Sequence, residues 1–457
     1  MQGQTVILES VQKLLRRNAD RNLAKILERT RPQDIAQLLR HFPGKDGVRI
    51  FKLLHGLEHQ AEVLAEADPE IQTTIADALS DVELAELLKQ MSGDDAADVI
   101  ERLPEDRATL ILSVWKDEEG REVDSLLAYG PDTAGGIMSP HVFALPEETT
   151  CREAIATLQE RHEELEMTFY LYVVNQHGTL VGVCSLRQLV VHDPNTPLHD
   201  IMASDVLSVD VLTDQEEVAR RVTRYNLLAI PVVDRSNRLV GVVTVDDVID
   251  VIREEATEDI LMMAGAGSAD LADVQNPFRN FAVRMPWLLA SFVGGIGSMF
   301  IIGAYESALD RVAALAAFIP ITIGMGGNVG TQAATIVTRG LALGRIPISQ
   351  FYTVVGREIL TGTLLGLTYG LLLSVVAMVR YAGLDHPGFE TWQLALTVAL
   401  SVAACMTIAA TVGGGVPMLL QRAGIDPAVA TGPFVTTAVD IIGILAYFLI
   451  ARALLGI

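Results

Sequence analysis

The sequence predicts a multidomain membrane protein: a cytosolic all-α superhelical domain, a tandem pair of α/β modules, an acidic connecting helix and a five-helix transmembrane domain. Charge is the first observation, because residues 284–457 hold 8 Lys and Arg against 7 Asp and Glu, whereas residues 1–283 hold 26 against 50. Hydropathy is the second, because the nearly neutral part contains five apolar segments of bilayer-spanning length. An internal repeat between about residues 137 and 252 is the third. An acidic soluble part therefore precedes a membrane part.

The acidic excess of the soluble part excludes one class of partner. A nucleic-acid-binding protein needs a basic surface, so no nucleic acid is expected. Strong negative charge favours solubility or an affinity for cations. Three cysteines, Cys151, Cys184 and Cys405, are too few and too scattered for a disulfide framework or a thiolate metal site. The first thirty residues carry charges throughout, so we expect no signal peptide and a cytosolic soluble half.

Residues 1–132 read as short helices separated by Pro and Gly. Segments 38–46, 87–95 and 99–106 resemble one another, each with an apolar helical stretch before a Pro or Gly and an acidic residue. Similar helical units in series predict a small solenoid, in which each unit packs on its neighbours. No nucleophile–base pair, P-loop or histidine cluster stands in the soluble half, so an enzyme is not expected.

Two copies of one pattern occupy residues 137–200 and 201–252. Ile137-Met-Ser-Pro recurs as Ile201-Met-Ala-Ser, and Leu180–Val190 recurs as Leu239–Ile249. Each copy predicts an amphipathic helix, two short strands joined by a turn, and a second helix. The pattern resembles a tandem pair of CBS domains (cystathionine-β-synthase modules).

CBS pairs commonly bind adenine nucleotides, and the resemblance implies a Ser or Thr followed three residues later by Asp. Thr244 and Asp247 fit this pattern, whereas Ser185 is followed by Gln188. ATP is therefore expected at one of the two sites at most. Tyr170 and Arg187 are candidates to stack on the base and to contact a phosphate, with core and surface roles as the alternative.

The connecting helix, predicted over residues 246–278, carries an excess of carboxylates. Acidic residues stand four apart at positions 246/250, 250/254, 254/258 and 255/259, and Arg253 is the one cation among them. Each such pair destabilises an isolated helix by about 0.2–0.5 kcal/mol, so a cation is expected to stabilise it. A solvated face is the alternative. Val248, Val251, Ile252 and Ile260 predict one buried stripe. Mg²⁺ suits such rows of oxygen ligands, and residues 94–98 offer a second row.

The transmembrane domain is predicted over residues 280–457. Its five spans are residues 286–305, 312–338, 359–379, 391–421 and 427–451. With the N-terminus inside, six arginines flank the cytosolic ends (Arg279, Arg284, Arg339, Arg345, Arg357, Arg422) and three flank the outer ends (Arg311, Arg380, Arg452). The positive-inside rule therefore predicts a cytosolic N-terminus and, after five spans, an outer C-terminus.

Asp440 is the acidic residue predicted well inside a span. A central Asp costs roughly 2.5–3.5 kcal/mol on insertion scales, so it usually faces a cavity, an ion path or a polar partner. Helical spacing places it on a small, polar face with Gly432, Thr436 and Gly443, as expected of a pore wall. A hydrogen bond to Ser or Thr of a neighbouring helix is the alternative.

A glycine-rich segment, residues 320–332, lies in the second span. Pro320 and four glycines surround Asn328, which predicts a broken helix whose freed carbonyls line a cavity. Close helix packing through small residues is the alternative. Residues 413–417 repeat the theme in the fourth span.

An acidic helical domain, a CBS pair, an acidic connecting helix and five spans follow one another along the chain. This order resembles that of the MgtE family of magnesium channels and transporters over essentially the whole chain. The matching segments are Gly135-Gly-Ile-Met138, residues 244–250, residues 255–259, residues 326–332, Asp426-Pro and residues 432–440. The resemblance implies a plasma-membrane homodimer that conducts Mg²⁺ and contributes to Mg²⁺ homeostasis. A membrane-anchored sensor that regulates a partner, and a transporter of Co²⁺ or Mn²⁺, remain alternatives.

The resemblance also implies two groups of Mg²⁺ ligands. The implied pore ligands are Asp440, Asn328, Ala428, Thr436 and Asp426. The implied cytosolic sensor residues are Asp94, Asp95, Asp98, Gly136, Glu216, Asp247, Asp250, Glu255, Glu258 and Asp259. At high cytosolic Mg²⁺ the ions would bridge these carboxylates and hold the connecting helix as a plug against the pore. At low Mg²⁺ the carboxylates would repel one another and release it.

Overall fold

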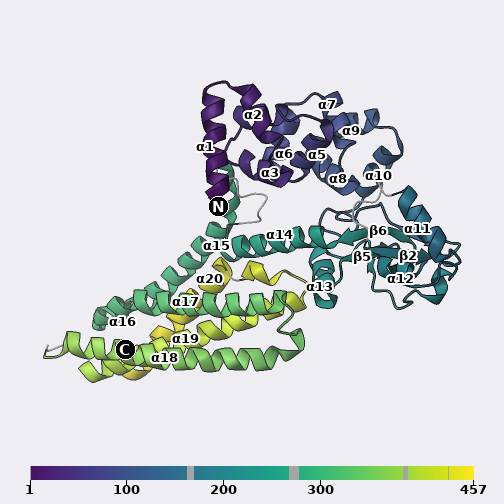
Figure 1. The fold of residues 1–457 in the computed structure, drawn as a ribbon. Helices are drawn as coiled ribbons and strands as arrows, with labels where there is room; N and C mark the ends of the chain where they lie inside the picture. The colour runs from purple at the N-terminus through teal and green to yellow at the C-terminus, as the bar shows by residue number, and fades with distance from the viewer. Residues whose placement is uncertain (1, 162–168, 267–276, 384–389, 431, 457) are drawn as a thin grey trace. The chain divides into compact units, whose positions relative to one another are not determined.

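The computed structural model describes residues 2–161, 169–266, 277–383, 390–430 and 432–456 (Figure 1). The chain divides into two compact units, Met1–Ile252 and Arg253–Ile457. The first unit contains the helical domain and the α/β pair. The second contains the connecting helix from Arg253 onward and the transmembrane helices.

Ten short helices form the N-terminal domain. They are α1 (Gln2–Arg16), α2 (Asp20–Leu27), α3 (Pro32–Leu39), α4 (Lys45–Lys52), α5 (Leu57–Ala65), α6 (Pro69–Asp77), α7 (Asp81–Leu88), α8 (Gly93–Glu101), α9 (Glu105–Val114) and α10 (Glu118–Leu126). Prolines begin α3 and α6, and a Ser80–Glu83 capping box begins α7. Helices two apart in sequence pack together, as in α3 with α5 and α5 with α7. The predicted superhelical domain is confirmed.

The α/β pair contains two three-stranded sheets of the same topology. The first contains β1 (Ala144–Pro146), β2 (Tyr170–Val174) and β3 (Leu180–Ser185), and the second contains β4 (Val209–Asp210), β5 (Ala229–Val233) and β6 (Leu239–Thr244). In each sheet the first pair of strands is parallel and the second pair is antiparallel. The accompanying helices are α11 (Cys151–Glu160), α12 (Leu186–Val191), η1 (Leu198–Asp200), α13 (Gln215–Tyr225) and α14 (Val245–Met263). The tandem CBS fold is confirmed.

The repeated Ile-Met segments exchange between the two sheets, which the sequence pattern did not reveal. Ser139, after the first segment, pairs with Val242 of β6, and Ala203, after the second, pairs with Val183 of β3. The preceding methionines lie over glycines of those strands. A Cβ added at Gly241 would be 2.5 Å from the Met138 sulfur, and one at Gly182 would be 2.2 Å from that of Met202. Each copy therefore completes the other, which makes the pair one structural unit.

The connecting helix is shorter than predicted. Helix α14 ends at Met263, because Gly265 adopts φ +68° and the Ala266 N–H returns to the Leu261 carbonyl. Residues 267–276 of the predicted helix lie outside the described residues. The predicted apolar stripe is half wrong: Val248 and Val251 are buried, whereas Ile252 and Ile260 are exposed within the chain.

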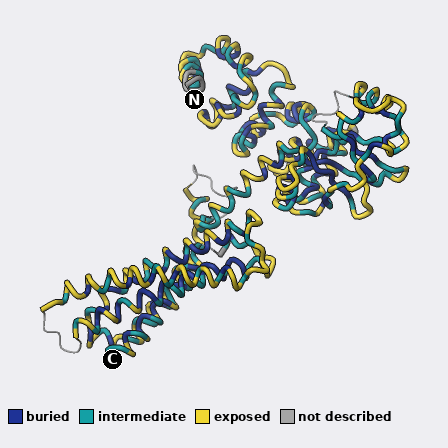
Figure 2. Tube along the Cα trace, turned by 60° about the horizontal axis from the view of Figure 1, so that its bottom comes forward, coloured by how far each residue is buried: buried dark blue, intermediate teal, exposed yellow. Residues whose placement is uncertain are grey.

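Five described helices are long and apolar enough to cross a membrane. They are α15 (Pro277–Ala304), α17 (Ala314–Ala342), α18 (Phe351–Tyr381), α19 (Thr391–Arg422) and α20 (Pro433–Leu455), with the short elements α16 (Glu306–Arg311), η3 (Ile348–Gln350) and η4 (Pro427–Ala430) between them. Helix α19 packs against α17, α18 and α20 and carries the bundle's largest set of buried residues. The buried residues run through the interior of this bundle (Figure 2).

The predicted break in the second span is wrong. Helix α17 runs without interruption through Pro320 and the glycines, so the carbonyls around Asn328 belong to the helical ladder. Gly326 lies against Cys405 of α19 and Val439 of α20, which is the packing that only a small residue permits. Likewise, a Cβ at Gly413 would lie 2.2 Å from the Gly330 carbonyl oxygen. The packing alternative is therefore correct for these glycines.

A second run of glycines was missed by the sequence interpretation. Gly362, Gly366 and Gly370 follow one another at four-residue spacing on α18, and each lies against α19. A Cβ at Gly366 would be 2.7 Å from the Ala403 Cα. This spacing lets two transmembrane backbones approach closely. The signal was present in the sequence as a repeated Gly-x-x-x-Gly.

Candidate sensor cavity and membrane carboxylate

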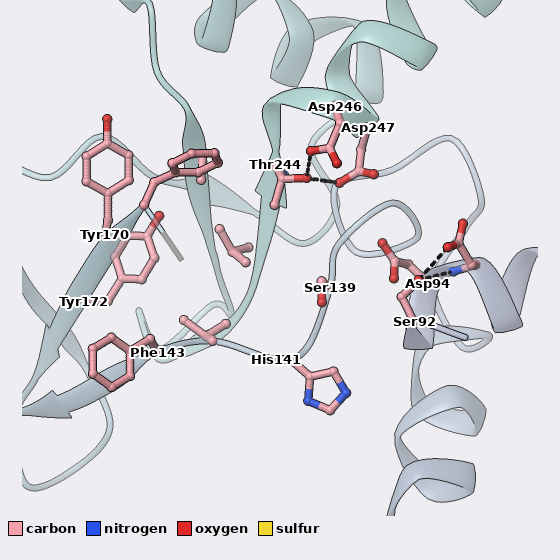
Figure 3. A pocket seen from close by; sticks show the side chains of 15 residues that line it. Ser92, Asp94, Ser139, His141, Phe143, Tyr170, Tyr172, Thr244, Asp246 and Asp247 are labelled. Atoms are coloured by element: carbon pink, nitrogen blue, oxygen red, sulfur yellow. Dashed lines mark hydrogen bonds between the residues drawn. The ribbon is translucent and has the colours of Figure 1, made fainter. Parts of the chain in front are cut away.

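A cavity of about 110 Å³ in the first unit brings several predicted residues together (Figure 3). It lies where the start of α8 meets the second sheet, the residues after Met138 and the start of α14. Its lining is Ser92, Asp94, Asp95, Ser139, His141, Val142, Phe143, Phe169, Tyr170, Tyr172, Ala229, Val242, Thr244, Asp246 and Asp247. The cavity therefore joins the helical domain's acidic row to the CBS pair.

Thr244 positions the carboxylates at the start of α14. Its hydroxyl donates to Asp247 Oδ2 and to Asp246 Oδ1, each at 2.5 Å, and its N–H donates to Asp247 Oδ2 at 3.3 Å. The Thr244 N–H takes a side-chain acceptor because β6 turns directly into the helix, and amides at the start of a helix lack intrahelical acceptors. Asp247 is thereby held at the cavity wall. Asp246 is a cavity residue that the sequence interpretation missed.

Asp94 faces the same cavity from the first turn of α8. Its Oδ1 is buried and has no hydrogen-bond partner among the described residues. Burial raises the pKa of Asp94, while the Ser92 hydrogen bond lowers it. Burial, with the nearby Asp94 charge, raises the pKa of Asp247 to about 8. The two carboxylates are close enough to repel one another, so a cation between them would relieve an unfavourable arrangement.

We expect this repulsion to make stability depend on pH. The folded-state pKa of Asp247 is above the unfolded value of about 4, so the folded protein binds the extra proton between the two. The free energy of unfolding should therefore fall as pH rises from about 4 towards 8. Asp247→Asn should flatten this fall, measured as thermal unfolding of the full chain at pH 5.5 and 8 without Mg²⁺. Asp106→Asn, at an exposed carboxylate of α9, serves as control; parallel profiles for wild type and Asp247→Asn would contradict the expectation.

The remaining predicted sensor residues of this unit lie outside the cavity lining. Asp98 is one turn beyond Asp94 and pairs with Arg102 at 3.7 Å. Gly136 serves a tight turn, because a Cβ there would lie 2.4 Å from the Gly130 carbonyl oxygen. Glu216 lies in the first turn of α13, and Asp250 lies in the second turn of α14. Within the described ranges, no three His, Cys, Asp or Glu side chains gather closely enough to hold a metal directly.

The three predicted nucleotide residues are not together. Tyr170 and Thr244 line the cavity, but Arg187 is exposed on α12 and does not. At that first CBS site, Gln188 accepts from the Ser185 N–H and hydroxyl and donates to the Ile201 carbonyl. Its amide is thus occupied by the fold. The cavity therefore brings Tyr170 and Thr244 together, and a nucleotide role for Arg187 stays a prediction.

The end of α14 lies within the second unit, against the start of α20. The Met263 carbonyl oxygen would be 3.3 Å from a Cβ at Gly432, and Pro433 Cδ would be 3.1 Å from one at Gly265. One turn earlier, burial and the Asp426 charge raise the pKa of Asp259, and Arg339 lowers it. Asp259 therefore lies within electrostatic reach of both charges. Glu255 and Glu258 are partly buried on the same helix.

The connection before α20 and the first turn of that helix contain three other predicted residues. Asp426 Oδ1 accepts from the Ala428 N–H at 2.8 Å, which caps the short helix η4. Ala428 is fully buried, and the preceding Pro427 carbonyl accepts from the Thr338 hydroxyl of α17 at 3.5 Å. The Thr436 hydroxyl donates to the Pro433 carbonyl at 3.1 Å. These bonds fix the chain where α20 begins.

Asp440 lies between two packed faces of α20. Val439, beside it, is buried against Gly326 and Gly330 of α17, and Gly443 lies against Cys405 of α19. The Asp440 side chain stays partly exposed within the single chain, and Asn328 is exposed on α17. The predicted stripe of small residues on α20 is therefore only partly available to line a pore, because Gly443 packs against α19.

Glu358 is a second carboxylate within the described spanning helices that the sequence interpretation left at the edge of a span. Helix α18 begins at Phe351, so Glu358 lies inside it. Its Cγ would be 2.8 Å from a Cβ at Gly414 of α19. The side chain is partly buried at this helix–helix contact. Asp440 is therefore not alone as an acid within these helices.

The fold defines a multi-pass membrane protein that carries soluble N-terminal domains. Three profiles match it: "Divalent cation transporter" over residues 319–450, "MgtE intracellular N domain" over 30–132, and "CBS domain" over 134–194 and 198–254. The chain is 37% identical over 450 residues to the magnesium transporter MgtE of Thermus thermophilus, covering 98% of each chain. It is 33% identical over 444 residues to that of Bacillus subtilis, covering 96% of this chain and 95% of the relative. The chain belongs to the MgtE family of magnesium transporters.

Two solved structures resemble the soluble part. The cytosolic domain of the Mg²⁺ channel MgtE in complex with ATP has a TM-score of 0.51 and 38% identity, covering 53% of this chain and 99% of that one. The soluble part of a magnesium transporter has a TM-score of 0.50 and 30% identity, covering 55% of this chain and 99% of that one. Both likenesses support the fold of the first unit.

Proposed function

We propose that the chain conducts Mg²⁺ across the plasma membrane and closes when cytosolic Mg²⁺ binds its soluble domains, thereby maintaining Mg²⁺ homeostasis. The observation that carries the proposal is Asp440, a partly exposed carboxylate held in the transmembrane bundle by packing on both sides. A carboxylate at membrane depth is costly unless it serves an ion path or a polar partner. Membership of a magnesium transporter family supports Mg²⁺ as the transported ion.

We place Mg²⁺ at Asp440 through its water shell, because Mg²⁺ dehydrates reluctantly. Asn328 and Thr436 would contribute polar groups along the path, with Ala428 and Asp426 at its inner end. One carboxylate balances half the charge of a divalent ion, so two copies related by symmetry would complete the site. The homodimer is supported by apolar side chains exposed on the CBS pair, including Leu212, which is 56% exposed, and Ile249, which is 45% exposed.

Gating would use the repulsion between the acidic groups. Mg²⁺ between Asp94 and Asp247 would neutralise the cavity, with Asp95, Asp98, Gly136, Glu216 and Asp250 contributing to this or neighbouring ions. At the other end of α14, ions at Glu255, Glu258 and Asp259 would favour the arrangement in which the helix end rests beside Gly432. Loss of the ions would leave like charges unneutralised and favour its release.

The proposed topology follows from the arginine distribution. The N-terminus and the soluble domains would be cytosolic and the C-terminus would be outside.

The proposal for ATP is restricted to its Mg²⁺ complex, because four acidic residues line the cavity that contains Tyr170 and Thr244. A nucleotide would enter there as its Mg²⁺ complex, in which the metal offsets phosphate–carboxylate repulsion. The relative solved with ATP supports testing it.

Flux through the purified protein in liposomes tests the proposal. We expect Mg²⁺ entry when the solution on the soluble-domain side holds little Mg²⁺, and its suppression when Mg²⁺ there is raised. Parallel measurements with Co²⁺ and Mn²⁺ decide the transported ion. Protein-free liposomes and liposomes containing the Asp440→Ala variant are the controls. Absence of flux in both conditions would favour a membrane-anchored sensor instead.

A further inference from the structure

We infer that the transmembrane helix α15 binds an anionic phospholipid of the cytosolic leaflet, with the phosphate at Arg284 and an acyl chain along the apolar stripe that follows it. An open groove of about 620 Å³ runs along this side of the helix. The choice of leaflet rests on the topology proposed above, whereas lipid binding itself does not require the chain to conduct an ion.

The groove follows one face of α15. Its described lining residues all belong to this helix, run from Pro277 to Phe292 and recur at intervals of three and four. Such spacing places side chains above one another on one side of a helix. The groove is therefore a continuous stripe that begins at the first residue of α15 and extends past its middle.

The opposite side of α15 packs inside the bundle against α20 (Figure 1). Gly294 lies against Thr437, and the rings of Trp287 and Phe434 meet edge to face with centroids 6.1 Å apart. The stripe is left uncovered by the described chain, and Phe281 on it is 66% exposed. Uncovered apolar surface on a spanning helix faces lipid or another polypeptide.

The polarity of the stripe changes along its length. Asn280 and Arg284 lie near its start, and Met285, Leu288 and Phe292 follow. The eight residues from Arg284 to Phe292 span about 12 Å of helix, close to one leaflet of a hydrocarbon core about 30 Å thick. A polar head followed by an apolar tail of this length is the order of groups in a phospholipid.

Arg284 gives the polar end its requirement for an anion. Its side chain is exposed, and the described residues provide it with neither an ion pair nor a hydrogen bond. A guanidinium presents a planar fork of donors that matches two phosphate oxygens. The Asn280 amide, one turn earlier, can donate to the same group. A lipid with a net negative charge is favoured, because the ammonium of a zwitterionic headgroup would offset the attraction.

A second copy of the chain is the competing occupant of the stripe. Subunits related by an axis along the membrane normal place equal residues at equal depth, so two α15 helices paired through the stripe would bring Arg284 towards Arg284. Like charges repel strongly where water is scarce. The described lining contains no Asp or Glu to offset them. Charge complementarity therefore favours the lipid.

Lipid selectivity of the full-length protein tests the inference. Native mass spectrometry in mild detergent measures the binding of phosphatidylglycerol and phosphatidylcholine that carry identical acyl chains. We expect phosphatidylglycerol to bind at least about fivefold more tightly. Glycerol 1-phosphate, which has the phosphate without acyl chains, should not displace it at equal concentration. Displacement would assign the site to a free phosphate ester and overturn the lipid.

Matched variants separate the head from the tail. Arg284→Gln should reduce the preference to within about twofold, whereas Arg357→Gln, which removes an exposed arginine near the start of α18, should leave it unchanged. Leu288→Ala should weaken both lipids by about twofold to fivefold and keep the preference. Thermal unfolding in lipid-free detergent checks that each variant is folded.

Two results with these lipids would overturn the inference. The first is equal binding of the two lipids by the wild-type protein. The second is an equal loss of preference in Arg284→Gln and Arg357→Gln, which would indicate a general effect of charge. Unchanged flux in a variant that loses the preference counts against neither proposal, whereas absent flux with an intact preference counts against the proposed function alone.

Cross-linking distinguishes the lipid from a second copy. Leu288→Cys is oxidised in native membranes, with the wild-type protein as control because its three cysteines are buried. We expect no more cross-linked dimer than in wild type. A specific cross-link at position 288 would assign the stripe to a second copy and overturn the lipid site.

Discussion

Asp440→Ala should abolish Mg²⁺ uptake in cells that lack their own Mg²⁺ transport. The reason is electrostatic: a divalent ion at membrane depth needs negative charge nearby, and Asp440 supplies it from the first half of α20. The neighbours Val439 and Gly443 are packed against α17 and α19, so the backbone at this position is held independently of the carboxylate. Growth at low external Mg²⁺ and fluorescent measurement of ion entry would quantify the loss.

Matched variants make this expectation specific to the charge in the path. Asp440→Glu should retain part of the uptake, because it keeps the carboxylate on a longer side chain. Asp310→Asn, at an exposed position on α16, should behave as wild type. Size-exclusion chromatography shows whether each variant stays folded and in the same oligomer. Normal uptake by a folded Asp440→Ala protein would remove Asp440 from the ion path.

Neutralising the end of α14 should leave the channel open at high cytosolic Mg²⁺. The triple variant Glu255→Gln, Glu258→Gln and Asp259→Asn removes the groups on which closing ions would act. Shifting a two-state gate from mostly closed to mostly open takes about 5.5 kcal/mol. Several ion contacts can stabilise the closed state by this much, and the variant removes those contacts. Mg²⁺-dependent closure in liposome flux or patch recordings measures the effect.

A control of equal charge change separates this site from general electrostatics. Glu105→Gln, Asp106→Asn and Asp205→Asn remove three exposed acids from the first unit, and should leave the Mg²⁺ dependence of closure unchanged. If the α14 variant still closes at the wild-type Mg²⁺ concentration, the proposed plug mechanism is wrong.

Periodicity and composition predicted the architecture because they report burial directly. Short amphipathic helices, two copies of a strand pattern and long apolar segments each have one favourable environment, so their fold class follows from the chain itself. The same patterns do not distinguish a glycine that breaks a helix from a glycine that allows two helices to pack closely. Gly326, Gly330 and Gly413 look alike whether they break a helix or let two helices touch, and only the contacts with Cys405, Val439 and the Gly330 carbonyl show the second.

The sensor residues divide in the same way. Their acidity and spacing predicted an affinity for cations, but the cavity also depends on Tyr172 and His141, which no acidic pattern marks. Arg187 and Tyr170 are near in sequence yet face different surroundings, because β3 and the turn into α12 separate them.

The sequence by itself determined that an acidic soluble part precedes five apolar spans, that the soluble part contains a repeat, and that Asp440 is a costly acid within a span. Those properties depend on composition and local periodicity. Only the tertiary structure decided that each Ile-Met segment completes the other copy's sheet, that α17 is unbroken, and that Asp94 and Asp247 share one cavity. Each of these depends on contacts between residues far apart in the chain, and local sequence carries little information about such contacts.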